Sequence, residues 1–271
     1  MRKIIIILFF GIVCFILYGI YIDTNGLIVN EHFIEEETIP ESFDGFKILH
    51  LTDVLYDEKT NPNQLDLIVT TVNELKPDVI VFTGDLFNKD YKPSDKDVKK
   101  VTNMLKKLDS SLYKYAIVGD NDQNVLKKYK LILNDSNFIL LDNSYTYLFY
   151  KDTNPIKIIG LSDSNNISEL LDNEDSIIPS YTIALTHYSD NFKNIKEYDI
   201  NLTLAGNSLG GQIRIPFVGG LIKKTGSKTY IDEYYEENNK KLYVSYGIGT
   251  EKYHIRTLNT PSINLYRLNA K

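Results

Sequence analysis

The pattern of apolar and polar positions predicts strands alternating with helices from residue 45 onward. Apolar runs rich in β-branched residues are typical of buried strands, and they occupy 46–52, 79–83, 115–118, 156–161, 183–186, 202–205, 241–246 and 262–268. Segment 64–75 places Leu65, Ile68, Val72 and Leu75 on one helical face, and 101–108 and 125–133 show the same spacing less clearly. This alternation favours one α/β domain over 45–271 with a mostly parallel sheet.

The N-terminal segment has a different pattern, because residues 4–22 are apolar on all sides and carry no charge. A helix needs about 20 such residues to cross a bilayer, and no small-residue cleavage site follows the run. We therefore expect a retained transmembrane anchor over 1–23 rather than a signal peptide or a buried helix. Arg2 and Lys3 predict a cytoplasmic N-terminus and an extracytoplasmic domain on the cell membrane. Residues 24–44 then form a spacer, whose acidic stretch 31–37 is either solvated or a first edge strand.

Composition narrows the classes of function. A net charge of −6 without a basic stripe argues against nucleic-acid binding. The single cysteine, Cys14, excludes a disulfide within the chain. Lipid attachment at Cys14 is the weaker interpretation, because Val13 stands where processing requires a small residue.

Five predicted strands end on polar side chains that could hold a metal ion. They lead into Asp53, Asp85, Asp120 with Asn121 and Asp122, His187, and Asn207. Each one alone is more often a turn or a helix cap than a ligand. The carboxyl ends of parallel strands lie together, so five of them favour a site at one edge of the sheet.

The motifs around these residues resemble those of the calcineurin-like metallophosphoesterases. They are Leu51-Thr52-Asp53, Gly84-Asp85-Leu86, Gly119-Asp120-Asn121-Asp122, Thr186-His187 and 206–212, which reads Gly-Asn-Ser-Leu-Gly-Gly-Gln. The segments 210–217 and 243–250 extend the resemblance toward the bacterial membrane-associated branch, whose members include lipid-sugar pyrophosphatases. The resemblance implies a four-layer α/β/β/α sandwich following one transmembrane helix, and a two-metal hydrolase.

Several positions that the resemblance assigns to catalysis carry other residues here. Leu55 and Leu209 stand where the family has histidine ligands of the first metal, which leaves Asp53 and Asp85. Asn121 replaces the catalytic histidine of the third motif and cannot carry a transferable proton.

The second metal position retains more donors. Its four positions are Asp85, Asp120, His187 and Asn207, and their oxygen and nitrogen atoms suit one Mg²⁺, Mn²⁺ or Ca²⁺ ion. The sequence thus predicts a membrane-anchored homologue with impaired catalysis that binds one divalent ion or a phosphorylated, lipid-linked ligand. Two alternatives stay open: an active one-metal phosphoester or pyrophosphate hydrolase, and a structural or partner-binding ectodomain with an empty pocket.

An apolar segment with a basic edge lies close to the last motif. Residues 216–222 are followed by Lys223 and Lys224. A buried strand and turn would explain the pattern, and so would a lip that touches the membrane.

Overall fold

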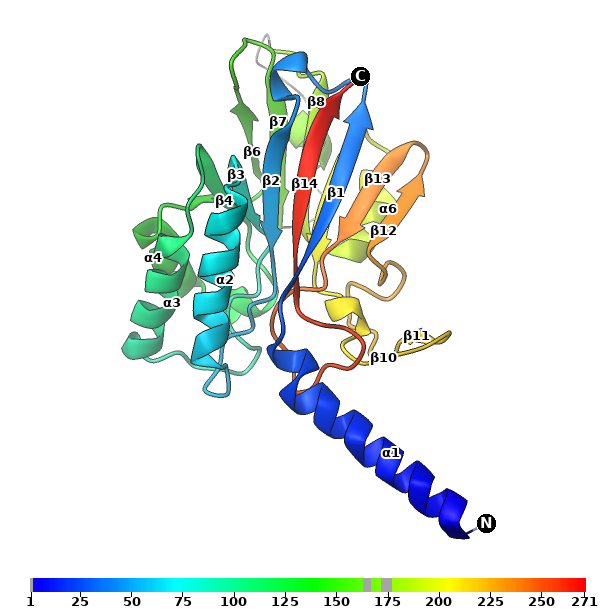
Figure 1. Cartoon of the computed structure of the whole chain (residues 1–271). Coiled ribbons are helices and arrows are strands. Elements are labelled where there is room, and N and C mark those ends of the chain that lie inside the picture. Colours follow the sequence, from blue (N-terminus) through cyan, green and yellow to red (C-terminus); the bar gives the residue numbers. More distant parts are fainter. Residues whose placement is uncertain (1, 163–166, 172–176) are drawn as a thin grey trace.

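The computed structural model describes residues 2–162, 167–171 and 177–271. Two six-stranded sheets form its centre (Figure 1). The first has the order β1-β14-β2-β3-β4-β5, with bounds Ile28–Glu36, Ser262–Ala270, Phe46–Leu51, Val79–Phe82, Tyr113–Ala116 and Ile139–Leu140. The second has the order β12-β13-β9-β8-β7-β6, with bounds Tyr234–Glu237, Lys240–Val244, Leu202–Gly206, Tyr181–Tyr188, Ile156–Leu161 and Ser144–Leu148.

Apolar side chains separate the molecule into the four predicted layers. The longer helices are α2 (Pro62–Leu75), α3 (Asp95–Lys107) and α4 (Leu126–Asp135), which pack on the first sheet through buried residues such as Ile68 and Leu105. A second cluster, including Ile48 and Ile183, fills the space between the sheets. A third places α5 (Ile167–Leu171) and α6 (Phe192–Ile195) on the outer face of the second sheet. The order is therefore α/β/β/α.

The acidic stretch that follows the N-terminal helix is an edge strand of the first sheet. In β1, residue Ile28 pairs with Ser262 and Glu36 with Ala270, in parallel register along the whole strand. The expected spacer over 24–44 therefore contributes a strand to the domain. Of the two interpretations that the sequence left open for the stretch 31–37, the edge strand is the one observed, and half-exposed, charged positions alternate along it.

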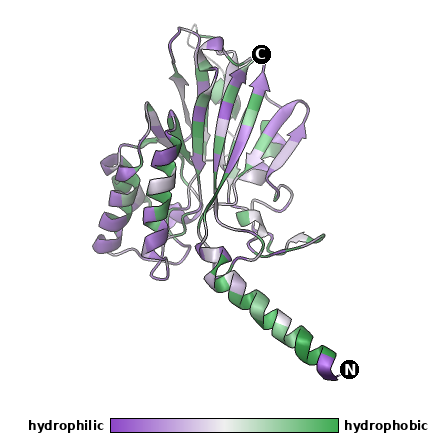
Figure 2. Cartoon of the chain, in the orientation of Figure 1, coloured by the Kyte–Doolittle hydropathy of each residue, from purple (hydrophilic) through white to green (hydrophobic). Residues whose placement is uncertain are grey.

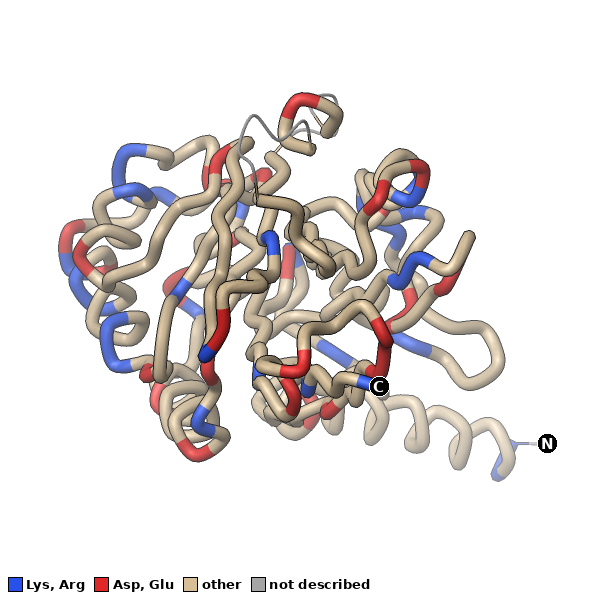
Figure 3. Tube along the Cα trace, turned by 90° about the horizontal axis from the view of Figure 1, so that it is seen from above, with Lys and Arg blue, Asp and Glu red and all other residues tan. Residues whose placement is uncertain are grey.

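Helix α1 (Arg2–Tyr21) projects away from the domain (Figure 1). It is long and apolar enough to cross a membrane, and most of its own residues are hydrophobic (Figure 2). Charged residues of both signs are intermixed around the domain, whereas the helix carries charge at its N-terminal end (Figure 3).

Parallel strands bring the predicted site residues to a common edge. Strands β2, β3 and β4 run parallel in the first sheet, and β7, β8 and β9 run parallel in the second. Asp53, Asp85 and Asn207 follow β2, β3 and β9, and His187 lies near the end of β8.

Candidate functional site

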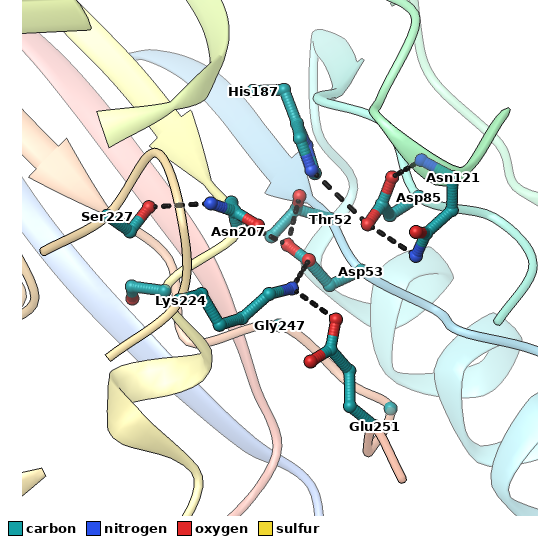
Figure 4. Close-up of polar contacts among 12 residues, drawn as sticks. Thr52, Asp53, Asp85, Asn121, His187, Asn207, Lys224, Ser227, Gly247 and Glu251 are labelled. Atoms are coloured by element: carbon teal, nitrogen blue, oxygen red, sulfur yellow. Dashed lines mark hydrogen bonds and ion pairs between the residues drawn. The ribbon is translucent and has the colours of Figure 1, made fainter. Parts of the chain in front are cut away.

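Three buried side chains meet where the two sheets face each other. One ligand atom from each of Asp53, Asp85 and His187 lies within 4.8 Å of the other two. Asn207, at the end of β9, joins them through its backbone N–H, which donates to Oδ2 of Asp53 at 2.9 Å (Figure 4). The carboxylates and the imidazole come from different sheets, so the fold itself assembles a group that could bind a metal ion.

The backbone at these positions is held in an uncommon conformation. Asp53 and Asp85 have φ of 49° and 59°, and Leu55 and Leu209 have φ of 48° and 49°. Leucine rarely adopts the left-handed region, whereas short polar residues tolerate it better. Leu55 and Leu209 are 2% and 1% exposed. The two positions that the resemblance assigns to histidine ligands therefore have left-handed backbone conformations, and their leucine side chains cannot coordinate a metal ion.

The two carboxylate oxygens of Asp53 have different surroundings: Oδ2 accepts hydrogen bonds from the protein, and Oδ1 accepts none among the described residues. Its Oδ2 accepts from Thr52 Oγ1 at 2.7 Å and from the N–H of Asn207. Gly206 is required here, because a Cβ on it would lie 2.1 Å from Thr52 Oγ1. Burial raises the pKa of Asp53, against the lowering effect of His187 and Lys224. Oδ1 makes no hydrogen bond among the described residues.

Asp85 is held by Asn121, the residue that the family resemblance places at the third-motif catalytic position. The backbone N–H of Asn121 donates to Oδ1 at 2.8 Å, and its side-chain amide donates to Oδ2 at 2.7 Å. Asp122 fixes the same turn, because its carboxylate accepts from the N–H groups of Asp85 and Leu86. Burial opposes the ionised form of Asp85, but the neighbouring His187 outweighs it and lowers the pKa. Asn121 thus positions a carboxylate.

His187 has the orientation of a metal-binding histidine. Its Nδ1 lies 2.7 Å from the carbonyl oxygen of Thr83, which accepts the proton on that nitrogen. This leaves Nε2 aimed into the site, 3.3 Å from Oδ2 of Asp85. Burial lowers the pKa of His187, but Asp85 and then Asp53 exceed that effect and raise it to about 9. Without a bound ion, the ring is therefore an imidazolium at neutral pH.

Lys224 enters the site from the loop that follows the hairpin of β10 (Arg214–Ile215) and β11 (Gly219–Gly220). Its Nζ lies 3.8 Å from Oδ1 of Asp53 and 2.9 Å from Oε1 of Glu251 (Figure 4). The prediction that Lys223 and Lys224 form a basic edge beside the segment 216–222 is therefore wrong for Lys224, whose side chain is 10% exposed. Lys223 is exposed. Sequence reasoning also missed Glu251.

The other predicted donors lie less centrally. Asp120 is exposed, and no oxygen of it belongs to the group formed by Asp53, Asp85 and His187 among the described residues. The amide nitrogen of Asn207 donates to the carbonyl of Thr225 at 2.8 Å and to Ser227 Oγ at 2.9 Å. The assignment of Asp120 and Asn207 as ligands stays a prediction.

Comparison with known proteins identifies the family. A model of the calcineurin-like phosphoesterase family matches residues 46–207, more than half of the chain. This chain belongs to that family.

Two bacterial relatives match most of the chain, and a vertebrate relative matches a short part of it. The uncharacterized metallophosphoesterase YkuE of Bacillus subtilis is 30% identical over 263 residues, covering 93% of this chain and 89% of that protein. Phosphodiesterase YaeI of Escherichia coli is 24% identical and covers 82% of each. A zebrafish transmembrane protein with a metallophosphoesterase domain is 42% identical over 53 residues, 20% of this chain and 12% of that protein. A solved dimetal phosphatase from zebrafish aligns with a TM-score of 0.44 at 11% identity, covering 76% of this chain and 88% of that one.

The residues present do not fit the first metal ion of a two-metal site. Two of its four positions are Leu55 and Leu209, and the remaining oxygen of Asp53 faces an ammonium group. A single ion fits better, because Nε2 of His187 is buried without a hydrogen-bond partner among the described residues and lies 3.3 Å from Oδ2 of Asp85. Asp53, Asp85 and His187 are the residues that would hold it, and its identity is unknown.

Proposed function

We propose that this chain is a membrane-anchored phosphoesterase homologue whose site binds at most one divalent cation and no longer supports two-metal hydrolysis. The observation that carries the proposal is the pair of buried leucines, Leu55 and Leu209, at two positions of the first metal. Two-metal hydrolysis needs both ions, one to activate water and both to stabilise opposite oxygens. Asn121, which clamps Asp85, offers no proton to a leaving group. Acid–base assistance of this kind contributes about 10²–10⁴-fold in rate.

A second candidate is a one-metal hydrolase, and the orientation of His187 favours it. When an ion is bound, it would supply a Lewis acid at Asp85 and His187. A cavity of about 80 Å³ adjoins His187 and is lined by Asp120, Tyr188 and Asn191, among others. This volume could accept a small phosphoryl group and the water that attacks it.

We further propose that the site faces the membrane. A short turn, Asp23–Asn25, joins the anchor to β1, and the start of β1 pairs with the start of β14, which lies beside the end of β2. The end of the anchor is fastened to the site loops: Thr24 Oγ1 accepts from the N–H of Arg256, and Asp23 accepts from that of Asn259. The side chain of Asn259 in turn donates to the carbonyl of Leu209 at 2.7 Å.

An exposed apolar hairpin supports the same orientation. Phe217, Val218 and Leu221 are exposed at its tip and flank, so the interpretation of this segment as a buried strand and turn is wrong. The hairpin lies at the end of the domain from which α1 leaves (Figure 1). A ligand at the membrane surface, such as a lipid-linked phosphate or pyrophosphate, would suit this placement. Arg2 and Lys3 predict that the domain is extracytoplasmic.

The test measures metal content and hydrolysis together. The full chain in detergent is assayed with bis-p-nitrophenyl phosphate with and without Mn²⁺, beside Asp85→Ala and the exposed control Asp66→Ala. We expect at most one ion per chain and no Mn²⁺-dependent turnover. Turnover that Asp85→Ala abolishes and Asp66→Ala retains would establish the one-metal enzyme instead.

A further inference from the structure

Lys224 occupies the place where the first metal ion would provide positive charge. The ligand positions of that ion include Asp53, Asp85 and the two leucines, and Nζ of Lys224 lies 3.8 Å from the free oxygen of Asp53. The side chain of Lys224 is only 10% exposed, and Asp53 is completely buried. Burial disfavours the ionised carboxylate and raises the pKa of Asp53, and a cation beside Oδ1 opposes that effect.

Two protein cations, Lys224 and His187, compensate the carboxylates of the site, and His187 acts on both Asp53 and Asp85. Lys224 forms ion pairs with Asp53 and Glu251, while His187 forms one with Asp85 (Figure 4). In a two-metal site this compensation comes from the ions. Here an ammonium fixed to the chain supplies it, and it repels any divalent ion that approaches the same oxygen.

A second replacement keeps the lysine in position. Asn207 stands where the family resemblance places a histidine ligand, and its amide donates to Thr225 and Ser227. Ser227 also closes the turn, because its N–H donates to the carbonyl of Lys224 at 3.1 Å. The loop 224–227 is therefore pinned over the site by a residue that would otherwise bind metal.

We infer that Lys224 is an internal substitute for the first metal ion: it stabilises Asp53 in the folded protein and excludes a cation from that position. The inference deepens the proposed function, on which it rests, by explaining how the domain remains folded when the first ion is lost. Its prediction is specific to Lys224, because the neighbouring Lys223 is exposed.

The test compares thermal unfolding of the full chain in detergent after treatment with EDTA. The variants are Lys224→Met, Asp53→Asn, the double variant of both, and Lys223→Met as matched control. Breaking a buried pair should lower the Tm of Lys224→Met by roughly 5–15 °C, and removing the orphaned charge in the double variant should restore at least half of it. Mn²⁺ should raise the Tm of Lys224→Met by at least about 3 °C more than that of wild type, Lys223→Met or the double variant.

Three results would overturn the inference: a Lys224→Met protein that behaves like Lys223→Met, an equal Mn²⁺ response in wild type and Lys224→Met, or a double variant no more stable than Lys224→Met. If Lys224→Met does not fold, folding of the double variant supports the inference and its failure to fold refutes it. Hydrolysis by the wild type would refute the proposed function while leaving these comparisons intact.

Discussion

His50 should make the domain sensitive to acid, although it lies behind the candidate site. It is buried in β2, and its Nε2 lies 2.7 Å from Oγ1 of Thr83, whose carbonyl holds His187. Burial, followed by repulsion from His32, lowers the pKa of His50 from 6.5 to about 3. The folded protein therefore keeps this ring neutral over a range in which the unfolded chain binds a proton.

The sign and size of the effect of pH on stability follow from this difference in the pKa of His50 between the folded and the unfolded chain. The contribution of His50 to the stability of the fold is fully present above pH 6.5 and is lost as the pH falls toward 3. Between these values the His50 ring is protonated only in the unfolded chain. At pH 5, one and a half units below the ordinary value, the loss is about 2 kcal/mol. For a domain of this size that corresponds to a fall in Tm of roughly 4–8 °C.

The assay is thermal unfolding of the full chain in detergent at pH 7.5 and pH 5. His50→Gln retains a hydrogen-bonding group for Thr83 but cannot titrate, so the change from pH 7.5 to pH 5 should lower its Tm by roughly 4–8 °C less than it lowers the Tm of the wild type. The control is His254→Gln, which replaces a half-buried histidine on a loop and should keep the wild-type difference. An acid-induced loss in His50→Gln as large as that of the wild type would refute the reasoning.

Three further predictions concern the site and its surroundings. The pKa of His187 is raised to about 9, so in EDTA its contribution to stability is present below pH 6.5 and is lost as the pH rises through 9. Urea unfolding should show a fall in the free energy of unfolding of about 3 kcal/mol between pH 6 and pH 9.5, and His187→Gln should remove most of that fall. The chain has no tryptophan, so Phe217→Trp provides a single reporter, whose emission in lipid vesicles should be quenched by brominated lipids; Phe149→Trp, at the opposite edge of the second sheet beside the end of β6, should not be quenched. Equal quenching of both reporters would argue against a membrane-facing hairpin. Finally, the triple variant Leu55→His, Leu209→His, Lys224→Met should bind one more Mn²⁺ ion per chain than wild type by elemental analysis, and an unchanged count would show that more than these three side chains excludes the ion.

Much of the fold was predictable because its strands are buried on both sides. Continuous apolar runs marked β2, β3, β7, β8 and β9 to within about two residues, and the polar residues after them led to Asp53, Asp85 and His187. Strand β4 was placed two residues too late, since the run 115–118 includes Ile117 and Val118, which are buried beyond the end of the ladder. Burial and strand pairing coincide only approximately at strand ends.

Lys224 and Glu251 could not be found from the sequence, because neither lies at a strand end. Two adjacent lysines after an apolar segment look alike in sequence, and the path of the loop decides that the side chain of Lys224 is only 10% exposed while Lys223 is exposed. That path depends on hydrogen bonds from Asn207 to Thr225 and Ser227, which are contacts between distant parts of the chain. Long-range geometry of this kind leaves no periodic signal.

The backbone of the metal motifs persists because it does not depend on metal. The N–H of Leu55 donates to the carbonyl of Asp85 at 3.1 Å, and the carbonyl of Asp53 accepts from the N–H groups of Ile248 and Gly249. Gly247, with φ of 64°, permits this approach, since a Cβ there would lie 2.7 Å from that of Asp53. These backbone bonds hold the left-handed turns whatever side chain they carry. Membership of the family therefore follows from a retained scaffold, whereas hydrolysis depends on a few side chains that can change without unfolding it.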